Sequence, residues 1–368
     1  MGNVNSLINV TLDKVEPAVY LSGDIIRGNV QFNITQRTKQ IDEIYLSLTG
    51  DIGYTTTRTI RIQNGQMERK TDYHNIRIFE KKILLDRPLI NDQTRIDINQ
   101  NDIKIFEAGI YKYPFSIRLP ENLPATLHPE DYPFVRYELQ VLIEKKWYHS
   151  NDRHRYPIRI YPRVNLFNIN YCQSSVKFGT KRKDITIKCI LQHAALIPGQ
   201  QTLLSLDIYN PNRLSIKRID VCFIQRYEIE QCRRRLELIR LSIPQLNNIY
   251  LQHIETTCPL IIPLAIPPSF NYKSQINRTI VHVDLHYDLK LEIKLKGLFQ
   301  DFDLQVPVII ATDSSQHPTC HRITSSILTK KNFVKLNFDN DNDNDNDNDD
   351  IPPPPYESVY FDDIPNNL

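Results

Sequence analysis

The stretch VHVDLHYDLKLEIKL, residues 281–295, alternates apolar and polar side chains without a break. Every odd-numbered position is apolar, and every even-numbered position is polar or charged. A period of two is that of a β-strand, in which successive side chains point to opposite faces. The stretch therefore predicts one long antiparallel strand with one face on a core and the other face toward solvent.

Shorter segments of the same kind occur along most of the chain. Four examples are GNVQFNI (28–34), EIYLSLTG (43–50), YELQVLIE (137–144) and TLLSLDIYN (202–210), which lie between Pro, Gly, Asn and Asp breakers. Helical periodicity is weak throughout. The sequence is therefore predicted to be all-β.

The two halves of the chain also resemble one another. YLSGDIIRGNVQFNI (20–34) is followed by KQIDEIYLSLTGD (39–51), and LIPGQQTLLSLDIYN (196–210) is followed by IKRIDVCFIQRYE (216–228). A proline-rich bend comes later in each half, at 113–127 and at 260–272, and a further strand pattern follows it. This repetition predicts two tandem antiparallel β-sandwiches, over residues 1–162 and 163–312.

The last 56 residues, 313–368, have a different composition. An alternating Asp/Asn run, DNDNDNDNDNDD at 339–350, precedes four prolines and has no apolar or β-branched residue. Such a composition predicts a disordered tail. The net charge of the chain is +2, but from Phe338 onward there are ten acids and no Lys or Arg, so the body carries 45 − 33 = +12.

Apolar runs are far shorter than the roughly 20 residues that span a bilayer, and the first residues lack the apolar core of a secretory signal. The six cysteines are scattered, without any C-x-x-C pair. Reduced thiols and a cytoplasmic location are the expectation.

Four segments carry a resemblance to a known family: VYLSGDIIRGNVQFNI (19–34), GIYKYPFSIRLPENLPATL (109–127), VRYELQVLIEKKW (135–147) and IPPSFNYKSQINRTIVHVDLHYDLKLEI (266–293). They resemble the arrestin family and, more narrowly, the α-arrestins. The resemblance implies two tandem immunoglobulin-like β-sandwiches that form a trafficking adaptor. Such an adaptor is not an enzyme. It links membrane cargo, the cytoplasmic parts of receptors or transporters, to HECT-type ubiquitin ligases for ubiquitination, endocytosis and endosomal sorting, with recruitment to the plasma membrane and endosomes.

Pro353, Pro354 and Tyr356 form a Pro-Pro-x-Tyr element directly after the acidic run. Consecutive prolines favour the polyproline II conformation, so little entropy is lost when the strip docks in an aromatic groove. The tyrosine ring adds apolar area and a hydroxyl that gives the strip a direction. We predict that these residues bind WW domains of a ubiquitin ligase; a tail without a partner is the alternative. Since the chain has one such element, how firmly a ligase with several WW domains is held stays open.

Two further positions suggest contact with a membrane or another anionic surface. Arg233, Arg234 and Arg235 form the densest basic cluster, which predicts either a contact with anionic lipid or acidic cargo, or a solvated loop between strands. The acidic tail folding back on the basic body is a third reading, and salt would weaken that contact. Gly2 and Ser6 match the N-myristoylation pattern, so peripheral membrane association is included among the expectations.

The sequence contains none of the common catalytic motifs. Neither nucleophile elbows, phosphate-binding glycine loops nor H-E-x-x-H motifs occur. His282, Asp284 and His286 share one face of the long strand and suggest a metal site, but a solvent-facing strand explains them better. No cofactor, no metal and no nucleic-acid partner is expected. A coat or sorting-complex subunit of the same fold, acting without ubiquitin ligase recruitment, remains the alternative function.

Overall fold

The computed structural model describes residues 7–14, 18–34, 41–61, 66–85, 88, 96–98, 104–145, 152–164, 174–182, 185–276, 278–297 and 301–312. Within these residues the chain is built from strands, and the one helix is a three-residue 3-10 turn, η2 (Pro244–Leu246). The prediction of an all-β chain is confirmed. The tail predicted to be disordered, 313–368, lies outside the described residues.

The first half of the chain forms a sandwich of two sheets. A three-stranded sheet has the order β1 (Leu7–Leu12), β3 (Ile25–Ile34), β8 (Gly109–Arg118). The five-stranded sheet has the order β2 (Val19–Leu21), β10 (Asp152–Tyr161), β9 (Phe134–Lys145), β4 (Ile41–Arg61), β5 (Met67–Leu84). A small separate ribbon pairs β6 (Ile96–Ile98) with β7 (Lys104–Phe106).

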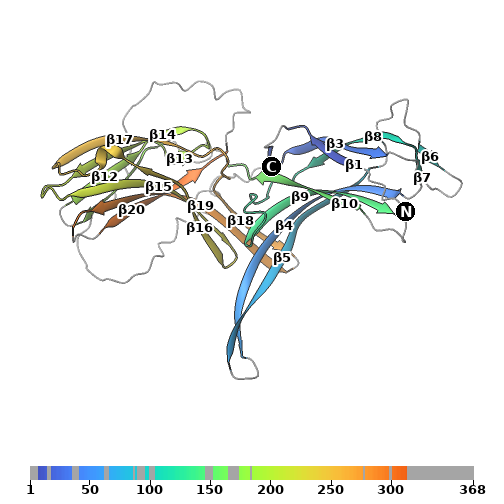
Figure 1. Ribbon diagram of the computed structural model, residues 1–368, viewed down its shortest axis with the longest axis horizontal. Coiled ribbons are helices and arrows are strands. Elements are labelled where there is room, and N and C mark those ends of the chain that lie inside the picture. The colour runs from blue at the N-terminus through green and yellow to red at the C-terminus, as the bar shows by residue number, and fades with distance from the viewer. Residues whose placement is uncertain are drawn as a thin grey trace, which may run out of the picture.

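The second half repeats this plan. A four-stranded sheet has the order β11 (Val176–Arg182), β12 (Ile185–Leu191), β14 (Gln201–Tyr209), β17 (His253–Ile261). The facing sheet has the order β13 (Ala195–Leu196), β20 (Phe302–Ile310), β19 (Thr279–Leu295), β15 (Ile216–Ile229), β16 (Cys232–Ser242), and β18 (Phe270–Ile276) pairs with β19 beside β20. Figure 1 shows the two sandwiches end to end.

The pairing pattern establishes the internal repeat. The five-strand order β2-β10-β9-β4-β5 has its counterpart in β13-β20-β19-β15-β16. In both sheets the short first strand lies parallel to the last one, while the other pairs are antiparallel. The short first strand is followed in each half by a glycine with φ of +82°, Gly23 and Gly199, a conformation that favours glycine. The two halves are therefore two β-sandwiches of one design, as predicted.

The stretch that predicts the fold, residues 281–295, lies in β19 at the centre of the second sandwich. Its odd-numbered side chains from Val281 to Ile293 are at most 1% exposed, so each contributes on the order of 1.5–3 kcal/mol of apolar burial. The opposite face was expected to meet water, and that expectation is only partly right. Asp284 and Asp288 are buried, because neighbouring strands place Asn271 and Arg226 over them.

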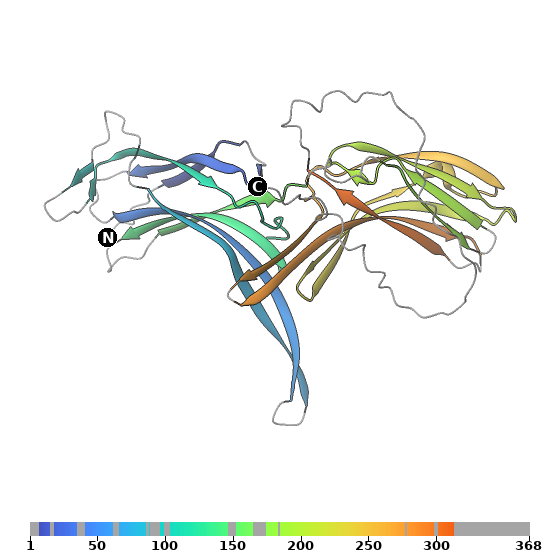
Figure 2. The same ribbon diagram turned by 180° about the vertical axis from the view of Figure 1, so that it is seen from behind.

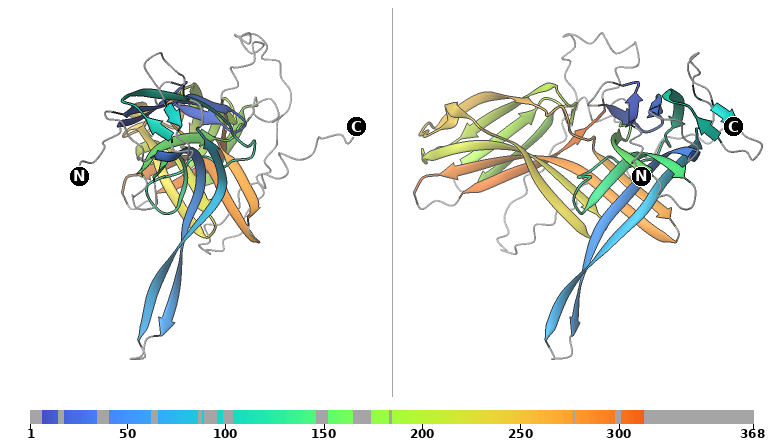
Figure 3. Two further views of the ribbon diagram at one scale, coloured as in Figure 1. Left: turned by 90° about the vertical axis from the view of Figure 1, so that its right-hand side faces the viewer. Right: turned by 45° about the vertical axis from the view of Figure 1, so that its right-hand side comes forward.

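One element projects from the body. The paired strands β4 and β5 are 21 and 18 residues long, and their far halves extend beyond both sandwiches as a twisted arm (Figure 1). The arm keeps this outward direction when the molecule is turned (Figure 2; Figure 3). Its surface is polar and basic near the end, with Met67 and Tyr73 exposed.

Candidate functional site

The residues predicted to bind WW domains, Pro353, Pro354 and Tyr356, lie outside the described residues, and so does Gly2. Their roles stay predictions. No helix in the described part of the chain is long and apolar enough to cross a membrane.

The arginines at 233–235 lie on strand β16, directly after the turn that joins it to β15, and not on a loop between strands. The loop reading was therefore wrong: the turn takes only Glu230 and Gln231, and the arginines already pair with β15. All three side chains are exposed. Contact with an anionic surface stays a prediction for this cluster.

Two of these arginines already have protein partners. The Nε of Arg233 lies 3.0 Å from a carboxylate oxygen of Glu228. Arg234 donates from Nη2 to the main-chain carbonyl of Tyr132 at 2.9 Å, and Tyr132 belongs to the first sandwich. Arg234 therefore joins the two sandwiches, a role that could not be recognised from the sequence.

More contacts join the sandwiches around the same turn. The thiol of Cys232 donates to the main-chain carbonyl of Thr55 at 3.0 Å. The rings of His128 and Tyr227 stack with their centroids 5.5 Å apart, and burial raises the pKa of Tyr227 to about 12. The β15–β16 hairpin thus rests against the base of the β4–β5 arm, as Figure 1 shows.

The chain crosses from the first sandwich to the second beside a compact charge cluster. Arg163, two residues beyond β10, donates from Nε to the carbonyl of Ser22 at 2.8 Å and forms an ion pair with Asp24. Lys14 lies 3.1 Å from the same carboxyl group. Burial opposes ionisation of Asp24, but hydrogen bonds from the Leu21 amide and Lys14, with the nearby cations, lower its pKa.

The last described residue returns to this crossing point. The amide of Thr312 donates to the carbonyl of Val164 at 3.1 Å, and the amide of Val164 donates to the Thr312 hydroxyl at 2.9 Å. Thr312, at the end of the second sandwich, therefore lies beside Val164. Val164 is three residues beyond the end of β10, at the junction between the two halves.

The outer face of the five-stranded sheet of the first sandwich holds an open hollow of about 390 Å³. Its lining comes from β4, β5, β9 and β10 and consists of Tyr45, Ser47, Thr49, Asp51, Asn75, Arg77, Glu80, Lys82, Arg136, Glu138, Gln140, Leu142, Arg153 and Arg155. Five of these residues are cationic and three are anionic, so the hollow carries a net positive charge of two. A surface of this kind suits an anionic partner.

The acids of the hollow are each engaged by a neighbouring cation. Arg77 lies 2.8 Å from Asp51, and Glu138 lies 3.5 Å from Arg136 and 3.9 Å from Arg155. The Nε atom of Arg136 is buried, and its contact with Glu138 is an ion pair that falls short of a hydrogen bond. Because the cations outnumber the acids that they engage, the hollow keeps a positive charge that an anion at this face could meet.

The three residues considered as a metal site, His282, Asp284 and His286, use their polar atoms within the protein. One carboxylate oxygen of Asp284 accepts a hydrogen bond from Asn271 at 3.2 Å, and the other lies 3.1 Å from Nδ1 of His286. The main-chain amide of His282 donates to Glu230 at 2.7 Å. This network orders the polar face of β19 in the region where it pairs with β18.

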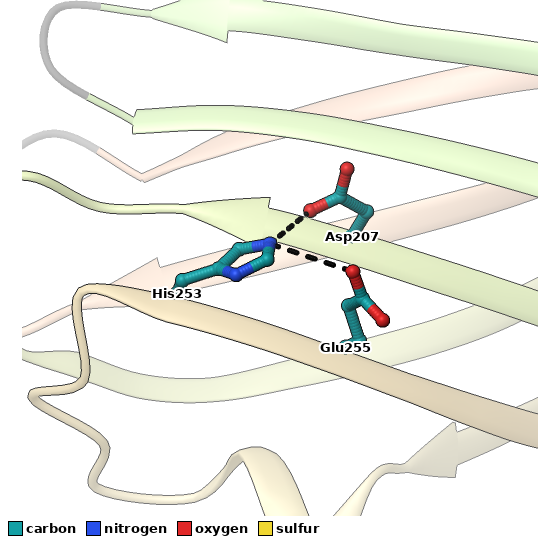
Figure 4. A group of neighbouring side chains, drawn as sticks. All are labelled: Asp207, His253 and Glu255. Atoms are coloured by element: carbon teal, nitrogen blue, oxygen red, sulfur yellow. Dashed lines mark hydrogen bonds and ion pairs between the residues drawn. The ribbon is translucent and has the colours of Figure 1, made fainter.

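A different group has the arrangement of metal ligands. Asp207 on β14 and His253 and Glu255 on β17 offer three ligand atoms within 4.8 Å of one another (Figure 4). Nε2 of His253 lies 2.8 Å from Asp207 and 3.8 Å from Glu255. No local pattern marks this group in the sequence, because His253 and Asp207 are 46 positions apart and meet only through the β14–β17 register. Since all three are solvent-accessible, the group by itself does not establish a metal site.

Comparison with known proteins assigns both halves of the chain. Residues 8–166 match the family model of the arrestin (or S-antigen) N-terminal domain, and residues 181–315 match that of the arrestin C-terminal domain. The chain is also similar to arrestin domain-containing protein 17 of Caenorhabditis elegans, with 27% identity over 128 residues. That match covers 35% of this chain and 28% of the relative.

The two matched segments together cover most of the chain and follow the two sandwiches in order. The resemblance found in the sequence is thereby confirmed: the chain belongs to the arrestin family and carries both of its domains.

Proposed function

We propose that this protein is an α-arrestin-like trafficking adaptor. The double sandwich contacts the cytoplasmic parts of membrane receptors or transporters, and the strip Pro353 to Tyr356 recruits a WW-domain ubiquitin ligase of the HECT type. The recruited ligase ubiquitinates the cargo that the double sandwich holds. Endocytosis and endosomal sorting of the cargo follow. The protein resides in the cytoplasm and moves to the plasma membrane and endosomes when it engages cargo.

The observation that carries the proposal is the coincidence of two features in one chain. Both arrestin domains are present, and a Pro-Pro-x-Tyr element follows them at 353–356. Both sandwiches present exposed side chains on the outer faces of their sheets, and such surfaces suit binding partners. A proline strip loses little conformational entropy when it binds, so the strip that follows the sandwiches in sequence suits an aromatic groove.

The shape of the first sandwich supports a role in holding cargo. The basic hollow lies on one outer face, and the β4–β5 arm projects beyond both sandwiches. Arg61, Arg69 and Lys70 on the arm are exposed, close to the exposed Met67. Anionic or apolar parts of a membrane protein would meet these surfaces together, which supports peripheral membrane association.

The experiment is a pulldown of the full chain with a tandem WW-domain fragment. The wild-type chain should bind, and Tyr356→Ala should reduce binding at least about tenfold, because the ring and hydroxyl of one short strip supply much of its contact. Tyr360→Ala is the matched control, since it changes a tyrosine four positions away in the same tail. Undiminished binding of Tyr356→Ala, or absence of binding by the wild-type chain, would contradict ligase recruitment.

The alternative function, a coat or sorting-complex subunit that acts without a ligase, makes the opposite prediction for a truncated chain. Deletion of residues 313–368 should then leave cargo sorting intact in cells. Under the adaptor proposal the same deletion abolishes cargo ubiquitination. Proximity labelling in cells that express the wild-type chain or a chain without Tyr356 would identify the ligase and the cargo in one experiment.

A further inference from the structure

Two carboxylates oppose each other on the outer surface of the four-stranded sheet. Asp207 on β14 lies directly opposite Glu255 on β17, the strand at the edge of that sheet. Leu206 and Ile208 beside Asp207 are buried, so Asp207 itself points to the outer surface. Opposed side chains of a strand pair have Cβ atoms about 4.5–5.5 Å apart, and like charges there destabilise the pair. Among the described residues, His253 is the one ion-pair partner of either acid. A cation between the two carboxylates would remove this repulsion.

Other acids of the same sandwich have their charge matched by a lysine or an arginine. Asp220, Asp288 and Glu292 on the facing sheet each form an ion pair with such a side chain. Lys188 on β12 lies opposite Asp207 on its other side and is exposed, but no ion pair joins the two in the described part of the chain. The two opposed carboxylates therefore carry charge that a cation from solution could neutralise.

The three side chains have the spacing of ligands around one ion (Figure 4). Their ligand atoms lie within 4.8 Å of one another, and Nε2 of His253 is 2.8 Å from Asp207 and 3.8 Å from Glu255. Ligands about 2.1 Å from a tetrahedral ion lie roughly 3.4 Å apart, a value between these two distances. Since all three side chains are solvent-accessible, they can make so small an adjustment without moving either strand.

We propose that Asp207, His253 and Glu255 bind one Zn²⁺ ion. Imidazole and carboxylate groups together are typical ligands of zinc, whereas Ca²⁺ and Mg²⁺ prefer ligands that are all oxygen. The charge of the ion balances the two carboxylates. Three protein ligands leave the fourth position of a tetrahedral site open. The proposal departs from the expectation of no metal, because these residues meet only in the folded sheet.

A zinc ion at this place would have two effects. It would fasten the edge strand β17 to β14 through side chains as well as through the main chain. Its open position would face solvent on the outer surface of the sheet, where water or a donor side chain of a bound protein completes the coordination. This inference goes beyond the adaptor function and stands whether or not a ligase binds the proline strip.

The test is a calorimetric titration of ZnCl₂ into the full chain after a chelator has removed bound metal. The wild-type chain should bind zinc, and His253→Gln should weaken that binding at least about tenfold. Loss of a group that merely supports a ligand costs about 10–100-fold in metal affinity, so loss of the ligand itself should cost no less. Asp207→Asn and Glu255→Gln should weaken binding in the same way. His193→Gln changes an exposed histidine of the same sandwich and should bind as the wild-type chain does.

A second measurement locates the bound ion, because the acidic run 339–350 offers further carboxylates. Diethyl pyrocarbonate attacks the imidazole nitrogen that would hold the metal. Zinc should therefore slow the reaction of His253 with this reagent, as followed by mass spectrometry of the wild-type chain, and should leave the rate at His193 unchanged. Equal zinc affinity in the wild-type and His253→Gln chains would overturn the proposal. So would equal protection of both histidines, which would show binding of an adventitious ion only.

Discussion

Tyr137 on β9 and Tyr287 on β19 hold the same position in the two sandwiches. Each ring is buried, and each hydroxyl donates to the carbonyl of a proline in the bend that precedes its strand, Pro124 at 2.8 Å and Pro267 at 2.7 Å. Burial raises the pKa of both phenols well above its ordinary value. The hydroxyls therefore remain protonated donors that fasten each proline bend to its sheet.

Removing either hydroxyl should destabilise its sandwich. Tyr137→Phe and Tyr287→Phe should each lower the free energy of unfolding by about 1–3 kcal/mol, because a buried carbonyl loses its donor. Denaturant unfolding of the full chain measures this. Tyr209→Phe changes an exposed tyrosine and should have little effect; equal losses in all three variants would contradict the equivalence of the buried pair.

Glu292 should make the protein sensitive to acid. Arg240 donates a hydrogen bond to its carboxylate at 2.8 Å and, with help from Lys290, lowers the pKa of Glu292 from 4.5 to about 2. A carboxyl group whose pKa is lowered by folding stabilises the native state fully above the unfolded pKa, and that contribution is lost as pH falls through the folded pKa. The stabilisation from Glu292 should therefore disappear between about pH 4.5 and pH 2.

Glu292→Gln tests this window. The variant should be about 1–3 kcal/mol less stable than wild type near pH 7, as for a charge-assisted hydrogen bond, and the difference should shrink below pH 4.5. Unfolding curves across pH measure it. Glu121→Gln alters an exposed acid, with 86% of its side chain exposed, and should show no such trend; a difference for Glu292→Gln that is independent of pH would exclude the proposed cause.

Arg234 should matter for the contact between the sandwiches, whereas its neighbour Arg235 should not. Arg234→Ala removes the bond to the Tyr132 carbonyl and should weaken the junction by about 1 kcal/mol. Hydrogen exchange should then rise around Tyr132 and Thr55 with little change elsewhere. Arg235→Ala is the matched control on the same strand, and a similar rise in both variants would show that local charge, not this hydrogen bond, holds the junction.

The buried thiols should resist alkylation in the native protein. Burial raises the pKa of Cys189 to about 12 and that of Cys222 to about 11, so little thiolate forms at pH 8. Treatment with iodoacetamide, followed by mass spectrometry, should leave both unmodified in the folded chain and alkylate both after denaturation. Rapid native labelling of Cys189 would contradict the close packing of β12.

The sequence predicted those features whose signals are local. Strand β19 follows from strict alternation, and the repeat follows from turns such as those at Gly23 and Gly199, where the glycines adopt a positive φ. The burial of Asp284 and Asp288 could not be predicted, because it depends on which strands lie beside β19. An alternating pattern shows which side chains share a face, but not what covers that face.

The candidate sites show the same limit. The proline strip is contiguous and so can be found in the sequence, whereas the hollow combines side chains from β4, β5, β9 and β10. The dense basic group at 233–235 is evident in the sequence, but Arg234 meets Tyr132 only because the two sandwiches lie against one another. Contacts between distant segments depend on tertiary arrangement, for which a run of residues carries no local signal.

The parallel pairing of each short first strand with the last strand of its sheet has a consequence during synthesis on the ribosome. Val19 pairs with Arg159, 140 positions later, and Ala195 pairs with Ile309, 114 positions later. Neither sandwich can complete its sheet until its final strand has emerged, and pairings so distant in sequence form slowly. We therefore expect each incomplete sandwich to expose apolar strand faces while translation continues, which creates a separate need for protection from aggregation in each domain.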